Sequence, residues 1–465
     1  MTHAPQYFGL VVRKSFIAFR AFSSLGRRYW RYISNSLWLI SDRLLASLIG
    51  LLVVAVVARY LGPSEFGLLS YTFSTALLFA VVGQLGLDGL VIREIVNRPD
   101  DVPRVLGTVF VLKFSGHLLG AAGLVVYALS IDVHSTERAM LFLAAAFIPL
   151  ASLSGFFGLW FHSRVQARYS AISSSISALL VGLGKLGFVW IGAAVMAFAA
   201  ANVVQVLIAA MLSFRFYRQQ KGPPVSAWRF SPAMARALLS ESWMLFLGSI
   251  FALIYLKIDM IMLRWLAGPA EVGTYAVAAT LSEAAYFVPA ALVASVFPKL
   301  IESAKTDQDL FGRQLQTVFD VLWLAGLGMI ATMFLVGGPL IRFLFGTEYG
   351  PSVPVLLVHV LSAPFLFMRI AFTRWTIIGG GATFFMLTEG LGALTNVAFN
   401  FLLIPHYGSI GAALATLVSY ATATYLTLAI PRRTRPIFVM MSRSAFMPWR
   451  APKDFFNYVR RSAHA

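Results

Sequence analysis

Long apolar runs separated by short polar segments dominate the chain from about residue 35 to residue 430. Each run is long enough to cross a membrane, because a helix needs roughly 20 mostly apolar residues to span the hydrocarbon core. The pattern therefore predicts an all-α polytopic membrane protein with about twelve transmembrane helices. The predicted spans are 35–59, 66–92, 105–130, 139–161, 170–191, 194–214, 239–263, 272–297, 318–340, 353–376, 382–404 and 409–430.

A six-residue phrase occurs twice within this pattern, 206 positions apart. It reads GPSEFG at 62–67 and GPAEVG at 268–273, and each copy connects two predicted spans. The Gly-Pro pair ends one helix, and the acid lies near the start of the next helix, where its charge suits the helix dipole. A pair of good tight turns explains these residues without any direct role in binding substrate. The two segments, 62–67 and 268–273, are together called the GPxExG repeat.

The GPxExG repeat also fixes the relation between the two halves of the chain. Six spans precede the helix that leads into the second copy, and an even number returns the chain to its starting side. Both halves therefore run the same way through the membrane and are predicted to be related by a pseudo-twofold axis along its normal. We expect a first six-helix bundle at 35–216, a linker at 217–238 and a second bundle at 239–430.

Composition supports the membrane assignment. Apolar residues make up 59% of the chain, charged residues 12%, and the mean hydropathy is +0.78. A soluble domain is typically about 45–50% apolar and about 25% charged. No cysteine is present, which excludes disulfides and thiolate chemistry but does not identify the cellular compartment.

The distribution of basic residues predicts the orientation. The net charge is +18, yet Lys and Arg lie mainly between spans and at the two ends, so their position argues against a nucleic-acid partner. With the N-terminus placed in the cytoplasm, 28 of the 37 basic residues fall on the inner side and five within spans. The remaining four face outward. Both termini are therefore predicted to be cytoplasmic. The four outward residues are Arg59, Arg138, Arg264 and Arg342.

The two ends of the chain are basic and rich in aromatic residues. Residues 1–34 are no secretory signal, because no cleavable small-residue site follows a short apolar core. Segments 1–34 and 431–465 are each expected either to lie on an anionic membrane face or to form a basic tail.

Several stretches resemble the polysaccharide flippase branch of the multidrug/oligosaccharidyl-lipid/polysaccharide exporter superfamily. The resemblance extends from about residue 35 to 430 and rests on the order and spacing of these stretches together. One departure is the sequence WFHS at 160–163, where the family pattern has a glutamine. The stretches are 58–67, 86–88, 92–94, 257–263, 268–275, 396–400 and 403–413.

The resemblance implies a Wzx-type flippase of the bacterial inner membrane. Such proteins move undecaprenyl-pyrophosphate-linked oligosaccharide repeat units to the outer leaflet for O-antigen, capsule or exopolysaccharide assembly. It also implies two six-helix bundles in a V around a central cavity, working by alternating access. Membrane lipids are expected partners, together with the polysaccharide polymerase and the chain-length regulator. No nucleic acid and no resident cofactor are expected.

Ionisable residues within predicted spans are the candidate site residues, because each costs several kcal/mol unless it meets water or a partner. The cations would attract a pyrophosphate along a hydrated path, or alternatively form internal ion pairs. They are Arg43, Lys113, Lys185, Lys257 and Arg369. The acids could bind H⁺ or Na⁺ and couple an ion gradient to transport, with Glu283 and Glu389 the best placed. They are Asp42, Asp259, Glu283 and Glu389.

Other charged residues have simpler interpretations. Asp88 and Asp320 lie near span ends and are expected to be interfacial, whereas His117 and His359 are expected to be packing residues that could titrate. Lys257 and Asp259 are two positions apart and so do not share a helix face, which predicts that each has its partner elsewhere.

The sequence also limits the classes of function. It contains no P-loop and no HExxH motif, and the glycine triplet at 379–381 follows no strand, so it is a weak phosphate signal. A transporter is therefore favoured over an enzyme. The alternatives are a peptidoglycan lipid-precursor flippase, a drug/cation antiporter of the same superfamily, a membrane polymerase or glycosyltransferase, and a scaffold protein.

Overall fold

The computed structural model describes residues 49–379 and 381–446, and within these ranges the chain is built from helices without a β-strand. Nine of the described helical segments are long and apolar enough to cross a membrane, which agrees with the predicted fold class. These segments are Ile49–Gly83, Pro99–Ser130, Ser135–Ser163, Arg168–Trp190, Val195–Gln219, Pro232–Leu266, Gln308–Phe345, Ser352–Thr373 and Thr383–Ala429.

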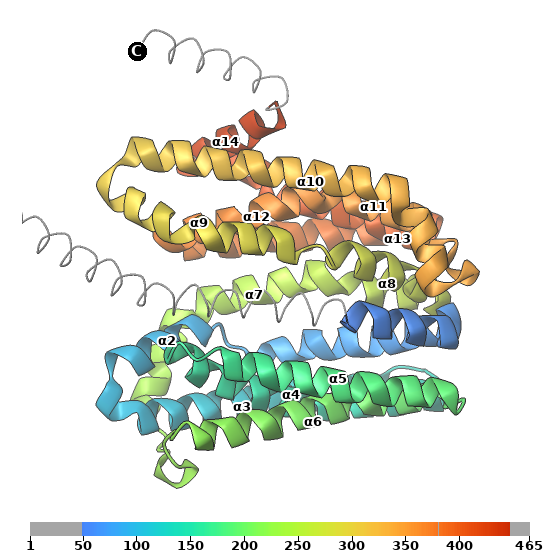
Figure 1. Cartoon of the computed structure of the whole chain (residues 1–465), viewed down its shortest axis with the longest axis horizontal. Helices are drawn as coiled ribbons and strands as arrows, with labels where there is room; N and C mark the ends of the chain where they lie inside the picture. The colour runs from blue at the N-terminus through green and yellow to red at the C-terminus, as the bar shows by residue number, and fades with distance from the viewer. Residues whose placement is uncertain (1–48, 380, 447–465) are drawn as a thin grey trace, which may run out of the picture.

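The helices labelled in Figure 1 are joined by short connections along the chain. The first described helix, Ile49–Gly83, carries no label and is called helix 1 here. The others are α2 (Asp88–Asn97), α3 (Val102–Ser130), α4 (Ser135–Ser163), α5 (Arg168–Trp190), α6 (Val195–Gln219), α7 (Pro232–Leu266), α8 (Pro269–Glu283), α9 (Phe287–Thr306), α10 (Gln308–Phe345), α11 (Ser352–His359), α12 (Ala363–Gly379), α13 (Ala382–Thr424) and α14 (Arg435–Ala445).

Two long helices contain two predicted spans each. Helix 1 is interrupted at Gly62 (φ 70°), and α13 at Gly408 (φ 53°, ψ −131°). Glycine adopts positive φ at little cost, so these residues are where the chain can turn. Helices α8 and α9 together supply one more span, and α11 and α12 form the span predicted at 353–376. The described chain thus accounts for the expected twelve spans, with the start of the first span lying outside the described residues.

The second span of each half contains a break, which the hydropathy pattern did not predict. In the first half, residues 84–87 separate helix 1 from α2, and Leu85 (φ 53°) and Gly86 (φ 64°) both leave the helical region. In the second half, residues 284–286 separate α8 from α9. Pro289 explains this second break, because its ring clashes with the carbonyl four residues earlier, at Ala285.

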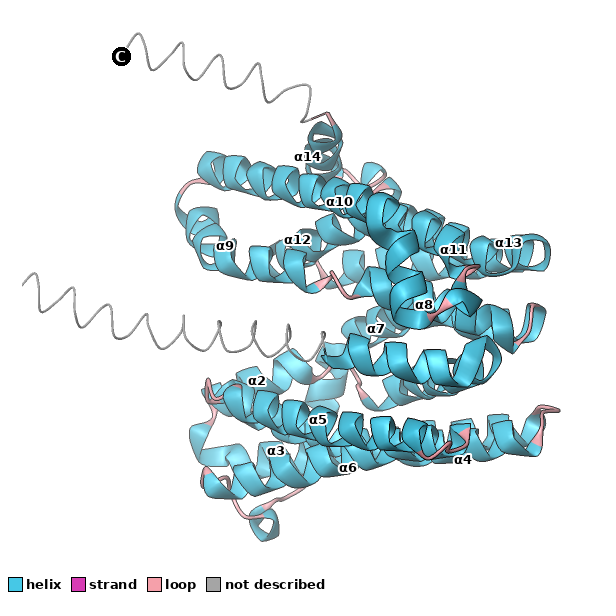
Figure 2. Cartoon of the chain, turned by 45° about the vertical axis from the view of Figure 1, so that its right-hand side comes forward, coloured by secondary structure: helices cyan, strands magenta, loops and turns pink. Residues whose placement is uncertain are grey.

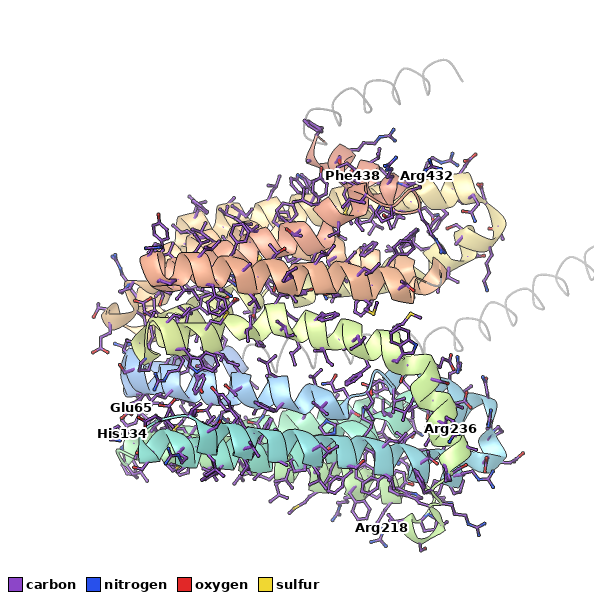
Figure 3. All side chains as sticks on the ribbon, turned by 180° about the vertical axis from the view of Figure 1, so that it is seen from behind. Glu65, His134, Arg218, Arg236, Arg432 and Phe438 are labelled. Carbon is purple, nitrogen blue, oxygen red and sulfur yellow. The ribbon has the colours of Figure 1, made fainter. Side chains whose placement is uncertain are left out.

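The halves form two bundles that approach each other at one end and diverge at the other (Figures 1 and 2). Figure 3 places Glu65 and His134 at one end of the molecule and Arg218 and Arg236 at the opposite end. We call the end with the GPxExG repeat the repeat end, and the end with Arg218 and Arg236 the linker end. The sequence places the connections that contain Glu65 and His134 on one side of the membrane and the connection from Arg218 to Arg236 on the other side. Their positions at opposite ends of the molecule agree with this prediction.

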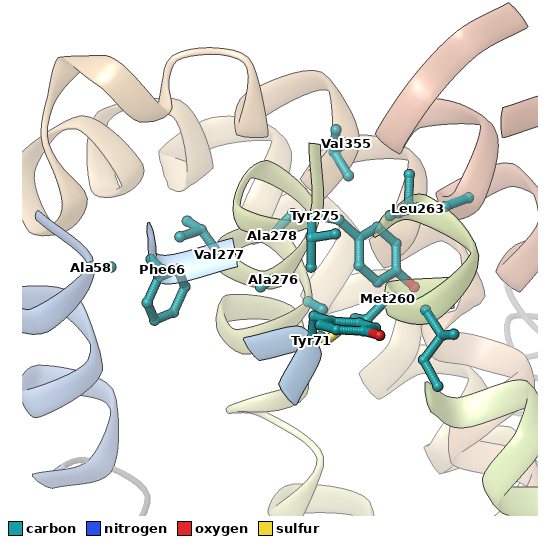
Figure 4. Packing of buried hydrophobic residues seen from close by; sticks show 14 of the residues in the cluster. Ala58, Phe66, Tyr71, Met260, Leu263, Tyr275, Ala276, Val277, Ala278 and Val355 are labelled. Carbon is teal, nitrogen blue, oxygen red and sulfur yellow. The ribbon is translucent and has the colours of Figure 1, made fainter. Parts of the chain in front are cut away.

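Among the described residues, the apolar cluster that both halves share lies at the repeat end. There Phe66 and Tyr71 of helix 1 belong to one cluster with Leu263 of α7 and Tyr275 of α8, as Figure 4 shows. Toward the linker end the described cores are separate. One contains Phe156 and other residues of the first half, and the other contains residues of the second half. Apolar burial therefore holds the bundles together at one end.

Two glycines of the GPxExG repeat form a reciprocal contact at the centre of this shared core. A Cβ at Gly67 would overlap the carbonyl oxygen of Pro269, and a Cβ at Gly273 would overlap the carbonyl oxygen of Pro63. Each copy of the repeat therefore leaves room for the backbone of the other. Close helix approach through small residues is common where helices pack inside membranes.

This contact predicts equal effects for two substitutions. Gly67→Ala and Gly273→Ala should each destabilise the closed repeat end by about 1–3 kcal/mol, because the obstructing atoms are backbone and cannot rotate away. Gly328→Ala in α10 is the control, since a Cβ there meets nothing within 4 Å. Thermal unfolding of purified variants measures the difference. Unchanged unfolding temperatures for both repeat glycines would contradict the close packing.

The predicted linker at 217–238 contains the end of α6 and the beginning of α7. The first turns of α7 belong to the first half, because Met234 and Leu238 are part of its core. Farther along, Gly248 faces Phe385 of α13, and α7 packs along α13. Helix α7 thus begins on one bundle and ends on the other.

Candidate functional site

Lys257 and Glu283 form an ion pair beside the helix break of the second half. Lys257 lies in α7 and Glu283 is the last residue of α8, and Lys257 Nζ is 3.5 Å from Glu283 Oε2. The side chains are 22% and 35% exposed. The pair is therefore only partly enclosed by the protein.

Lys113 and Asp88 form the corresponding pair in the first half. Asp88 is the first residue of α2, directly after the break at 84–87, and its carboxylate contacts Lys113 Nζ from α3. Asp88 is 61% exposed, whereas Lys113 is almost buried. His117, one turn along α3, donates from Nδ1 to the Lys113 carbonyl oxygen at 2.6 Å, and its ring lies where a Cβ at Gly83 would be. Each half therefore places one Lys–carboxylate pair beside a broken helix.

Arg369 and Glu389 form a closed pair within the second bundle. Arg369 Nη2 donates to Glu389 Oε2 at 2.9 Å, and Arg369 Nε donates to Glu389 Oε1 at 3.1 Å. Tyr255 Oη donates to the same carboxylate at 2.6 Å, and its ring lies 5.3 Å from the guanidinium carbon. Both charges are largely buried, so this pair has its hydrogen-bonding groups occupied.

Asp259 is a buried carboxylate whose partners are neutral. It is 1% exposed and accepts hydrogen bonds from side chains of α8 and of both parts of α13, at 2.6–3.0 Å. Among the described residues no Lys, Arg or His lies within ion-pair distance of it. We call this group the Asp259 cage. Its donors are Tyr275 in α8, Asn396 and Asn400 in the first part of α13, and Thr416 in the second part of α13.

The partners of Lys257 and Asp259 agree with the expectation from helix geometry. The two residues are close in sequence but point to different neighbours, Glu283 for the lysine and the Asp259 cage for the carboxylate. His359 lies near this region as a buried packing residue, with its Nδ1 2.7 Å from Ser282 Oγ and its ring 5.8 Å from that of Tyr275.

The remaining candidate residues lie apart from these groups. Lys185 in α5 donates to Asn202 Oδ1 of α6 at 2.6 Å, within the first bundle. Asp320 in α10 accepts from Gln316 Nε2 and from Ser444 Oγ, at 2.9 Å and 2.7 Å, and so attaches α14 to α10. Asp42 and Arg43 lie outside the described residues.

Two carboxylate contacts at the repeat end were not predicted from the sequence. Glu137 of α4 is 3% exposed and accepts from Arg264 Nη2 at 2.6 Å and from Nε at 3.1 Å, which joins the first half to the end of α7. Glu271 of the GPxExG repeat accepts from the backbone N–H of Ser409 at 2.8 Å. It therefore caps the helix that starts after Gly408, rather than its own helix.

A buried tyrosine adds a further contact between the halves at the repeat end. Tyr349 lies in the turn between α10 and α11, and its hydroxyl donates to the Ala58 carbonyl oxygen of helix 1 at 2.9 Å. Burial raises the pKa of the Tyr349 phenol, so the group stays protonated and keeps donating at all physiological pH values. The repeat end is therefore held by polar as well as apolar contacts.

Each bundle carries one Lys–carboxylate pair beside a broken helix. No group of three or more His, Asp or Glu side chains in the described part of the chain could hold a metal ion. The two partly open Lys pairs supply positive charge on both bundles, and broken transmembrane helices commonly mark binding sites in transporters.

Comparison with known proteins identifies the family. A family model described as polysaccharide biosynthesis protein matches residues 32–304. The chain belongs to this family. It is 26% identical over 406 residues to a protein of Haloferax volcanii named "Probable flippase AglR", covering 84% of this chain and 81% of that protein. It is 25% identical over 402 residues to a Shigella flexneri protein named "Putative O-antigen transporter", covering 82% and 93%. The resemblance to Wzx-type flippases of the superfamily is thereby confirmed, and these relatives are transporters rather than enzymes.

Solved structures with the same fold belong to other transporters. The lipid II flippase MurJ, in an inward closed conformation, matches with a TM-score of 0.67 at 16% identity, covering 89% of this chain and 91% of that one. An inward-facing multidrug MATE transporter matches with a TM-score of 0.67 at 12% identity, covering 88% and 99%. At these identities the similarity concerns the fold alone, and it confirms the two-bundle architecture.

Proposed function

We propose that this polysaccharide flippase moves undecaprenyl-pyrophosphate-linked oligosaccharide repeat units across the bacterial inner membrane. The units would travel from the cytoplasmic leaflet to the outer leaflet for surface polysaccharide assembly. The names of the relatives support a flippase in general, and the charge pattern supports an anionic head group. The polyprenyl chain would remain in the bilayer while the head group passes between the bundles.

The observation that carries this proposal is the pair of partly open Lys–carboxylate contacts, Lys113–Asp88 and Lys257–Glu283. A pyrophosphate oxygen can replace the carboxylate as the partner of each ammonium group, so one ionic contact is exchanged for another. Such an exchange has a small net free energy, which lets the head group bind and leave again. The closed Arg369–Glu389 pair is less suited, because opening it would leave two buried charges without partners.

We propose alternating access as the mechanism. The shared core joins the bundles at the repeat end, whereas the described cores are separate toward the linker end. The basic loops favour a cytoplasmic linker end with both termini on that side. The described conformation would then be closed outward. Opening the repeat end requires the contact between Gly67 and Gly273 and the Glu137–Arg264 pair to separate.

A coupling ion would act most simply at the Asp259 cage. Of the candidate acids, Glu283 and Glu389 are each paired with a cation, whereas Asp259 has only neutral partners among the described residues. A carboxylate in such a site can take up H⁺, or it can hold Na⁺ together with amide and hydroxyl oxygens.

Asp259→Asn is expected to remove the dependence of transport on an imposed ion gradient, because the amide carries no charge to neutralise. Membrane vesicles with imposed H⁺ or Na⁺ gradients provide the measurement. Asp320→Asn is the matched control. It replaces an aspartate of the second half by asparagine in the same way, but Asp320 attaches α14 to α10 and is not part of the Asp259 cage. Gradient-dependent transport by the Asp259 variant at the rate of the unsubstituted protein would exclude this site.

Deleting the gene in its native host tests the proposed function. We expect lipid-linked repeat units to accumulate on the cytoplasmic side and the surface polysaccharide to disappear. Normal surface polysaccharide without accumulation would contradict a flippase for this substrate. Accumulation of a lipid-linked peptidoglycan precursor instead would identify the alternative substrate.

A further inference from the structure

An apolar slot of about 400 Å³ opens at the repeat end between the two halves. Leu52 and Val56 of helix 1 and Val189 of α5 line it from the first half, and Phe343 and Leu344 of α10 line it from the second half. Arg59 and Tyr60, at the end of the same stretch of helix 1, complete the lining. The slot therefore combines a hydrocarbon wall with one cation.

The Arg59 guanidinium is available for a ligand. Its side chain is exposed, and within residues 49–379 and 381–446 no carboxylate lies within ion-pair distance of it. Gly346 lies opposite, because a Cβ built there would be 3.6 Å from Arg59 Cγ. The nearby carboxylate of Glu348 is directed toward Gly62 instead, where a built Cβ would lie 3.4 Å from Glu348 Oε2. The cation is thus beside α10 without a fixed anion.

The position of the slot connects it with the path of the substrate. A lipid whose head group passes between two bundles must keep its chain in a seam where the bundles meet the bilayer. This slot lies in such a seam, at the end where the proposed transport finishes. Its walls come from both halves, so it is formed when the repeat end is closed. An apolar slot with one arginine matches a single hydrocarbon chain that carries a phosphate.

We propose that this slot is the exit-side site of the carrier lipid, and this inference rests on the proposed function. The polyprenyl chain occupies the apolar slot, and Arg59 binds the phosphate adjoining it. The ligand class is a polyprenyl phosphate or pyrophosphate in the outer leaflet. Arg59 thereby acts as a binding residue outside the internal path of Lys113 and Lys257.

Binding to the purified full-length protein tests this site independently of transport. The protein is placed in nanodiscs of phosphatidylcholine, and bound undecaprenyl phosphate is measured by native mass spectrometry. We expect Arg59→Gln to weaken binding about tenfold or more, since a charge-assisted contact is lost. Val56→Trp, which fills the slot from a partly exposed position, is expected to weaken binding similarly. Undecaprenol, which has the chain without the phosphate, should bind equally weakly to the unsubstituted protein and to Arg59→Gln.

Arg342→Gln is the matched control. Arg342 is an exposed arginine of α10 at the same end, but it does not line the slot. Binding that is unchanged in Arg59→Gln, or reduced equally in Arg342→Gln, would overturn the site. Equal binding of phosphatidylglycerol would overturn it as well, because the slot would then be a general lipid site. If the deletion strain retains normal polysaccharide, the proposed function fails, whatever these binding measurements give. If the deletion abolishes polysaccharide but Arg59→Gln binds normally, only the exit site fails.

Discussion

Replacing Lys257 with alanine is expected to lower polysaccharide export about tenfold or more while the protein remains in the membrane. The ammonium group lies 3.5 Å from Glu283 Oε2 and is partly open, so its loss removes an attraction for a passing pyrophosphate without emptying the core. A charged hydrogen bond contributes about 1.5–3 kcal/mol, which sets the size of the effect. Complementation of the deletion strain, with polymer and membrane protein both quantified, provides the measurement.

The matched variants separate the loss of charge from the loss of packing. Lys257→Arg keeps the cation and should retain most export, and Lys113→Ala should resemble Lys257→Ala because it removes the corresponding charge of the first half. Lys305→Ala is the control, since Lys305 is an exposed residue of α9 outside both pairs. Export at the unsubstituted level by both Lys113→Ala and Lys257→Ala would rule out the proposed cationic path.

The second large effect is expected at the repeat end, where Arg264→Ala should destabilise the protein by about 3 kcal/mol or more. Glu137 is almost fully buried, and loss of its arginine leaves a carboxylate without a compensating charge. Arg93→Ala is the matched comparison. Arg93 pairs with Glu241 in an equally bidentate contact at 2.6 Å and 2.7 Å, but both side chains are nearly half exposed. Its loss should therefore cost no more than about 1 kcal/mol.

A double substitution checks that the penalty comes from the buried charge. Arg264→Ala combined with Glu137→Gln should be more stable than Arg264→Ala alone, because the uncompensated carboxylate is gone. Thermal unfolding of purified protein gives each value. If the double variant is as unstable as the single one, the contribution of Arg264 is packing rather than charge.

The transmembrane arrangement could be predicted from the sequence because it depends on local patterns. Apolar runs indicated the spans, and Gly62 and Gly268 indicated where chains turn, since only glycine adopts positive φ freely. The family resemblance was likewise carried by short stretches around these turns. The break in the first half was not predictable, because Leu85 is a non-glycine residue with positive φ inside an apolar run.

The partners of the charged residues could be predicted only in part. Helix geometry correctly predicted that Lys257 and Asp259 have different partners. It could not predict that these partners are Glu283 and the donors of the Asp259 cage. Those partners come from helices that meet only in the folded chain, such as α7 and α13. The Glu137–Arg264 pair was missed for the same reason. The reciprocal contact of Gly67 and Gly273 had a signal in the GPxExG repeat, which we interpreted only as two separate turns.

Reconstitution tests the central claim most directly. Purified protein is placed in liposomes that contain an undecaprenyl-pyrophosphate-linked oligosaccharide, and a membrane-impermeant glycosidase reports how much of it reaches the outer leaflet. The account predicts that the unsubstituted protein moves the lipid between leaflets and that Lys257→Ala behaves nearly like protein-free liposomes. Movement no faster than in protein-free liposomes, from protein that is folded and correctly inserted, would contradict the account.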